Sequence, residues 1–292
     1  MKNNDEMFHI VNDFENFLDD KNLKMYGVSK QDILNLIYLK KNKNEPFYQK
    51  ILQVIDDIDK KILVNSDCLI KKNTVLFRAR KVTAKDFAYD KNNSEEVDFW
   101  DNYIKGYQCG FGREDILQEY INKKRNMVVC LNEEISNDLS NGYCGLRKEL
   151  CGAPPKSLCK GQRCNIDGER VLYLGDAIET CLLECCANCG ETFNIGEFVA
   201  VKDLYFFDIS TLSEYYAQFW FSCLFSDVEQ EGNYIKSQII SFLIQKKGYA
   251  GIKYRSVKNC KGFCYAVFDP EKFECRRSYL VKPIELTVKY IR

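Results

Sequence analysis

The stretch ETCLLECC, residues 179–186, places one glutamate, Glu184, among cysteines and leucines. Read as a helix, it carries apolar side chains on nearly every side, so a carboxylate there is costly to bury without a partner. Glu184 is then either a solvent-exposed residue or a carboxylate at the floor of a cleft, tuned by desolvation and nearby positive charge. A fixed carboxylate of the second kind can stabilise positive charge that develops during a reaction.

The cysteines around Glu184 offer a competing explanation, a zinc site. The chain has 15 cysteines, and Cys186–Cys189 is its only C-x-x-C spacing. Structural zinc sites usually pair two such short spacings, so we expect no metal ligands here. A catalytic Cys–His pair would have to use His9, the single and remote histidine. The thiols are expected to be reduced and to pack as small apolar groups.

Two arginines are candidates to bind an anion. Arg78 lies in TVLFRARKV (74–82), an alternating segment predicted to be a strand that packs the Val75 face and turns the Arg78 face toward an anion. Arg163 lies in GQRCNIDG (161–168), a loop before a predicted strand, where a guanidinium can grip a phosphate with two hydrogen bonds. Taken singly, each arginine is also explained as a surface charge.

The elements that must position these residues change in character near residue 70. Residues 1–66 show helical periodicity, with the first stripe running from Met7 to Leu18 and a second helix beginning after Ser29. Residues 70–292 mix strand and helix patterns, which indicates an α+β domain. The sequence therefore predicts a helical N-terminal region over 1–66 and a catalytic domain over 70–292.

Within the second range, the order of predicted elements is a strand at 170–175 and then a helix at 176–189 that Asp176 caps. Two acidic segments rich in Asn and Ser, 89–98 and 132–142, are predicted to be surface loops. Helices are predicted over 116–124, 212–225 and 234–248, and strands over 197–209, 250–256, 261–269 and 283–291.

Composition excludes several classes of function. The chain has 42 basic and 42 acidic residues, so no net charge favours nucleic acid or an anionic membrane. The first 20 residues build no apolar signal region, and the apolar run 215–225 is too short to span a bilayer. We expect a cytoplasmic protein.

Four polar residues occur in an order and spacing that resembles the RES-domain family, named for an Arg–Glu–Ser set, whose members include toxins of bacterial toxin–antitoxin pairs. They are Arg163, Tyr173, Glu184 and Ser256, carried by RCNIDGERVLYLGDAIETCLLE and GIKYRS, with YAVF following. The resemblance covers about residues 74–270. It departs from the family at Gln162, which stands where the family usually has a glycine directly before the arginine.

The resemblance implies an ADP-ribosyltransferase-like mixed β core with flanking helices, and an enzyme that cleaves the nicotinamide–ribose bond of NAD as glycohydrolase or phosphorylase. NAD is then the substrate, and no cofactor is implied. Glu184 would stabilise the oxocarbenium-like transition state and Tyr173 would stack on nicotinamide. Arg163 and Arg78 would hold the pyrophosphate, and Ser256 would orient Glu184 or the ribose.

Other readings stay open at this point. Tyr173 can equally be a core residue of its strand, and Ser256 a turn residue. The same fold can transfer ADP-ribose to a protein, and a non-catalytic zinc-containing interaction module is a third alternative. An antitoxin or regulatory protein is an expected partner in a toxin–antitoxin or anti-phage system, and the helices of 1–66 can bind it, mediate homo-oligomer formation or cap the catalytic domain.

Overall fold

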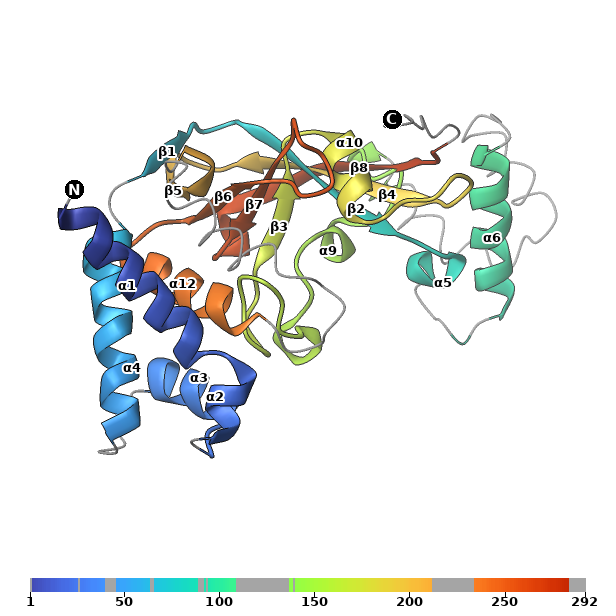
Figure 1. Cartoon of the computed structure of the whole chain (residues 1–292). Helices are drawn as coiled ribbons and strands as arrows, with labels where there is room; N and C mark the ends of the chain where they lie inside the picture. Colours follow the sequence, from blue (N-terminus) through green and yellow to red (C-terminus); the bar gives the residue numbers. More distant parts are fainter. Residues whose placement is uncertain are drawn as a thin grey trace, which may run out of the picture.

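Eight strands form one mixed sheet in this computed structural model, which describes residues 2–25, 27–39, 46–63, 66–88, 92, 94–108, 137–138, 140–211 and 234–283. Their order across the sheet is β1-β5-β6-β7-β3-β2-β4-β8 (Figure 1). The bounds are β1 Asp67–Ile70, β2 Val75–Lys81, β3 Leu172–Gly175, β4 Phe193–Ala200, β5 Leu204–Asp208, β6 Gly251–Arg255, β7 Phe263–Val267 and β8 Phe273–Val281.

All neighbouring strands in this order run antiparallel except β5 and β6, which are parallel. In the middle of the sheet, β7 pairs with β6 on one side and β3 on the other, so that Cys264 lies opposite both Tyr254 and Gly175. The expected α+β class and the mixed β core with flanking helices are confirmed. The centre of the sheet therefore brings together segments that lie far apart in the sequence.

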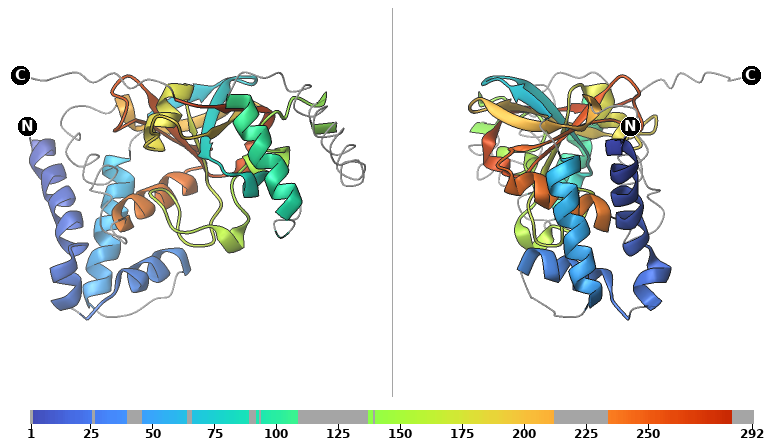
Figure 2. Two further views of the ribbon diagram at one scale, coloured as in Figure 1. Left: turned by 90° about the vertical axis from the view of Figure 1, so that its right-hand side faces the viewer. Right: turned by 60° about the vertical axis from the view of Figure 1, so that its left-hand side comes forward.

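Helices of the N-terminal region and α12 lie on one side of the sheet, as both views of Figure 2 show. The N-terminal helices follow an amphipathic pattern whose apolar residues face α12. The described helices are α1 Lys2–Phe17, α2 Asp20–Met25, α3 Lys30–Leu39, α4 Pro46–Asp57, a π-helical turn η1 Ile58–Ile62, α5 Ala84–Phe87, α6 Ser94–Gln108, α9 Lys148–Cys151, α10 Ile178–Glu184 and α12 Ile235–Lys246, with short 3-10 turns at Lys156–Leu158, Ile209–Thr211 and Pro270–Lys272.

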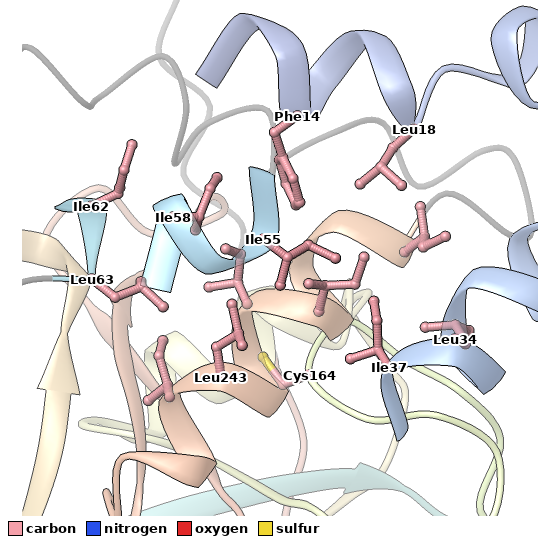
Figure 3. Packing of buried hydrophobic residues seen from close by; sticks show 14 of the residues in the cluster. Phe14, Leu18, Leu34, Ile37, Ile55, Ile58, Ile62, Leu63, Cys164 and Leu243 are labelled. Atoms are coloured by element: carbon pink, nitrogen blue, oxygen red, sulfur yellow. The ribbon is translucent and has the colours of Figure 1, made fainter. Parts of the chain in front are cut away.

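One hydrophobic core joins the N-terminal helices to the sheet. Phe14 and Ile58 pack with Leu243 of α12 and with Cys164, the residue that follows Arg163 (Figure 3). Ile33 belongs to the same core. Ile33 and Ile58 are completely buried. Because Cys164 belongs to this core, the N-terminal helices support the loop that carries Arg163. A second core lies on the other face of the sheet and includes Leu172, Leu174 and Tyr265.

Several predicted boundaries need correction. The strand predicted over 197–209 is two strands, β4 and β5, because the chain turns at residues 201–203. The described final strand is β8, which was not predicted, while the predicted strand 283–291 falls almost wholly outside the described residues, as do the helices predicted over 116–124 and 212–225. The loop predicted over 89–98 contains the start of α6, at Ser94.

The helix that carries Glu184 is also shorter than predicted. Its N-cap is Ala177, and Asp176 instead accepts a hydrogen bond from the Thr180 hydroxyl at 2.8 Å. The helix ends at Glu184 because Cys186 takes a left-handed conformation with φ of 50°. This conformation costs free energy for a residue with a side chain and terminates helices. Glu184 therefore occupies the last helical position.

Candidate functional site

Glu184 reaches the centre of the sheet because α10 packs closely on β2 and β3. The thiol of Cys181, on the buried side of the helix, donates to the Phe77 carbonyl at 3.2 Å. A Cβ at Gly175 would lie 2.6 Å from the Cys181 sulfur, so only glycine permits this approach. The close packing fixes the position of the helix end and leaves the Glu184 side chain half-buried.

Ser256 is bound directly to Glu184. The Ser256 hydroxyl donates to Glu184 Oε1 at 2.5 Å, and it accepts the backbone N–H groups of Lys258 at 3.2 Å and Asn259 at 2.9 Å. A serine hydroxyl has one proton and two acceptor sites. Since both acceptor sites are filled, the proton points at Glu184, and the carboxylate oxygen is the acceptor. Ser256 is 5% exposed, so little water competes for it.

The loop that carries Arg163 is fixed by hydrogen bonds of Tyr173, from the neighbouring strand, and of Asn165, within the loop. The Tyr173 hydroxyl accepts the Cys164 N–H and donates to Asn165 Oδ1, each at 2.9 Å. The Asn165 amide in turn donates to the carbonyls of Lys160, Ile166 and Glu169. In this structure the Tyr173 hydroxyl therefore positions the loop, while stacking of its ring on nicotinamide stays a prediction.

Tyr254 lies between the Arg163 loop and the residues around Glu184. The guanidinium carbon of Arg163 lies 6.0 Å from the centroid of the Tyr254 ring, at the limit of cation–π contact. Burial raises the pKa of the Tyr254 phenol well above its usual range; Cys264 and Glu184 add to the rise, and Arg163 opposes it. Tyr254 lies opposite Cys264 in the sheet, and the Cys264 thiol in turn contacts Glu184, so this phenol lies between Arg163 and the residues that bind the carboxylate.

Cys264 makes the second contact to Glu184. Its thiol donates to Glu184 Oε1 at 3.6 Å, and it is 5% exposed. Burial and the neighbouring Glu184 raise the pKa of this thiol, so it keeps its proton at neutral pH. Within the described residues, the contacts to the carboxylate of Glu184 thus end on the same oxygen.

Arg78 lies differently from the prediction. Leu76, on the same face as Arg78, is 3% exposed, so that face is covered as well as the face of Phe77, on which α10 packs. Arg78 Nη1 donates to the Cys151 carbonyl at 2.9 Å and to the Gly152 carbonyl. Desolvation lowers its pKa. The guanidinium holds the segment around α9 in place, and a role in binding pyrophosphate stays a prediction.

The cysteine-rich end of α10 does not form a metal centre in the structure. Among the described residues, no group of three or more His, Cys, Asp or Glu side chains is arranged to hold a metal ion. Cys185, Cys186 and Cys189 are exposed, and no described cysteine forms a disulfide. The alternative of a zinc-containing module gains no support from this part of the chain. No described helix is long and apolar enough to cross a membrane.

Sequence reasoning did not find three residues of this cluster. Tyr254 and Cys264 were assigned to short strands without a role at Glu184. Gln238, whose amide donates to the carbonyls of Gln162 and Asn165, was assigned only to a helix. The alternation of GIKYRS places Tyr254 on the face of Ser256, a signal that could have found it. No local pattern marks Cys264 or Gln238, because their contacts are to residues distant in the sequence.

Residues 145–289 match the family model described as RES domain. The predicted resemblance to RES domains is confirmed for this region, which includes Arg163, Tyr173, Glu184 and Ser256. Among solved structures, the crystal structure of the M. tuberculosis MbcT–MbcA toxin–antitoxin complex matches with 14% identity, over 45% of this chain and 76% of that chain, at a TM-score of 0.33. A search of curated protein sequences found no match.

Proposed function

We propose that this chain cleaves the bond between nicotinamide and ribose in NAD. The observation that carries the proposal is the oriented hydrogen bond from Ser256 to Glu184, next to the Tyr254–Arg163 pair. It supplies one half-buried carboxylate of fixed direction and one guanidinium on a loop that is held by hydrogen bonds. Those are the two charges that cleavage of a dinucleotide at its ribose requires.

In this reaction the C–N bond breaks and nicotinamide leaves as a neutral molecule with the bonding electron pair. The ribose is left with oxocarbenium character, which Glu184 stabilises as carboxylates do in glycoside cleavage. Because the leaving group departs neutral, no general acid is required. Arg163 is the residue expected to hold the pyrophosphate, since a guanidinium binds phosphate oxygens with paired hydrogen bonds.

Within the described residues, the guanidinium of Arg163 forms no ion pair with the protein. Its neighbour is the face of Tyr254, which attracts a cation without neutralising it. An arginine held in this way keeps its hydrogen-bond donors available for a ligand. The family match and this geometry together support an anionic substrate at the Arg163 loop.

The test is release of nicotinamide from NAD by the purified chain, with and without phosphate. We expect turnover in the wild type and a loss of about 10²–10³-fold in Glu184→Gln, since one preorganised electrostatic group is removed. Glu179→Gln is the matched control, because Glu179 is exposed on the same helix and loses the same charge. Full activity of Glu184→Gln would remove this carboxylate from the mechanism.

The same experiment identifies the molecule that accepts ADP-ribose. Attack by water on the oxocarbenium carbon gives ADP-ribose and a proton, and attack by phosphate gives ADP-ribose 1″-phosphate. Transfer to a protein would instead add the mass of ADP-ribose to a polypeptide, which mass spectrometry detects. The proposal favours the first two outcomes, because the resemblance to RES domains implies NAD degradation.

The proposed biological role is that of a toxin that a partner protein inhibits. Depletion of NAD would arrest a cell that makes the free protein. Expression of the wild type is therefore expected to stop growth and to lower cellular NAD, whereas Glu184→Gln is expected to do neither. Growth arrest that persists in Glu184→Gln would separate toxicity from NAD cleavage.

A further inference from the structure

Two donors of different strength meet on one oxygen of Glu184. The Ser256 hydroxyl donates to Oε1 at 2.5 Å and the Cys264 thiol donates to the same atom at 3.6 Å. A carboxylate has two oxygens with about four acceptor sites in total. The two donors occupy the acceptor sites of Oε1. Among the described residues no donor contacts Oε2, so this oxygen is available to a ligand.

We propose that Cys264 is a positioning residue, whose thiol acts with Ser256 to lock Oε1 of Glu184 and leave Oε2 as the oxygen that meets the substrate. The inference rests on the proposed function and extends it from the residue to the atom. One donor alone would allow the carboxylate to rotate about its terminal bond, because that torsion is soft. A second donor from another strand removes this freedom.

The register of the sheet explains why a cysteine fits at this position. Cys264 lies opposite Gly175, which has no side chain, and opposite the bulky Tyr254. The Cys181 thiol from α10 occupies the space that a side chain at position 175 would need. A thiol is small enough for the remaining space and still reaches Glu184.

Protonation of the thiol is consistent with this role. The titratable and charged groups around Glu184 are Cys185 on its own side, Cys264 of β7, Tyr254 of β6 and, beyond the phenol, Arg163. The buried Cys264 thiol is protonated at neutral pH and acts as a donor, as an ionised thiolate could not. Two anions in this space would repel each other, so the donor must be the thiol.

The kinetic test compares Cys264→Ala with Cys264→Ser. Alanine and serine differ by one hydroxyl, so the pair isolates the donor from the volume. We expect kcat for NAD to fall about tenfold in Cys264→Ala with little change in KM, as for loss of a weak hydrogen bond to a charged group. Cys264→Ser is expected to recover most of the rate. Cys260→Ala, at an exposed cysteine of the same hairpin, is the control.

Two outcomes would overturn the inference. One is wild-type kcat in a folded Cys264→Ala, and the other is equal loss in both variants with unchanged melting temperatures. If the wild type fails to release nicotinamide, the proposed function fails, and a second measurement still decides the role of Cys264.

That second measurement is infrared difference spectroscopy, comparing each protein with its Glu184→Gln counterpart to isolate the Glu184 carboxylate band. The stretching frequencies of a carboxylate depend on the hydrogen bonds it accepts, so we expect the Glu184 bands to shift in Cys264→Ala and to return toward the wild-type position in Cys264→Ser. Identical bands in Cys264→Ala and wild type would exclude the thiol as a donor, whether or not NAD is the substrate.

Discussion

The hydroxyl of Ser256 accepts two backbone N–H groups and donates its proton to Glu184. The same hydroxyl therefore stabilises the turn and orients the carboxylate. The turn fixes the hydroxyl, and the fixed hydroxyl fixes the carboxylate. This explains how a chain with a single histidine can orient a reactive group without an imidazole.

Replacement of Ser256 by alanine tests that coupling. We expect Ser256→Ala to lower NAD turnover by about tenfold or more and to cost about 1–2 kcal/mol of folding free energy, because two N–H groups lose their acceptor. Kinetics and thermal melting measure the two effects. Val257→Ala, at an exposed neighbour, should change neither. Undiminished turnover in Ser256→Ala would mean that Glu184 is oriented by other groups.

At the scale of elements, α12 braces the loop that carries Arg163. Gln238 is 7% exposed, and its amide donates to the carbonyls of Gln162 and Asn165, each at 3.0 Å. These two carbonyls flank Arg163. Gln238 of α12 binds the main-chain carbonyl of Gln162, which every residue type has. The departure from the family pattern at Gln162 therefore does not remove this contact.

Gln238→Leu removes both of these hydrogen bonds at similar volume. We expect KM for NAD to rise more than kcat falls, because the loosened loop weakens the binding of substrate by Arg163. We also expect a stability loss of about 1–3 kcal/mol, because two hydrogen bonds are lost and each carbonyl keeps only the backbone N–H of the other residue. The comparison is Gln245→Leu, at an exposed site on the same helix. A fall in stability with unchanged KM would limit Gln238 to a structural role.

Sequence patterns predicted these elements unevenly. The helix over 234–248 and the short strands β6 and β7 were predicted close to their true bounds, since each has a clear period. The alternation of β2 was recognised, but only one of its faces was predicted to be packed, and both are covered in part. Leu76 is buried, and Arg78 finds carbonyl partners under α9. Periodicity defines two faces, and only the neighbouring segment decides which one is covered.

For the whole molecule, the shared core is the main feature. The N-terminal helices bury Phe14, Ile37 and Ile58 in one core with residues of α12 and the Arg163 loop (Figure 3). Strands β1 and β2, which precede the region that matches the family model, belong to the same sheet as β3 to β8. The region that matches the family model therefore shares its sheet and one of its cores with earlier parts of the chain.

Ile58→Ala tests whether the N-terminal helices are part of one cooperative unit. Its side chain is fully buried, so we expect a loss of about 2–5 kcal/mol, a single melting transition at lower temperature, and reduced NAD turnover at temperatures near that transition. Leu158→Ala, at a side chain that is 69% exposed, should leave melting unchanged. Two separate transitions would show that the helices unfold independently.

The sequence by itself determined the α+β class and the helical start of the chain, because periodicity is a local property. Arg163, Tyr173, Glu184 and Ser256 were singled out by the resemblance to RES domains. Only the tertiary structure decided what those residues touch. Ser256 and Glu184 are 72 positions apart, and their contact depends on the approach of α10 over Gly175. The inward turn of Arg78, the second donor from Cys264 and the support from α12 have the same origin: each is made by packing between distant segments, which no local pattern records.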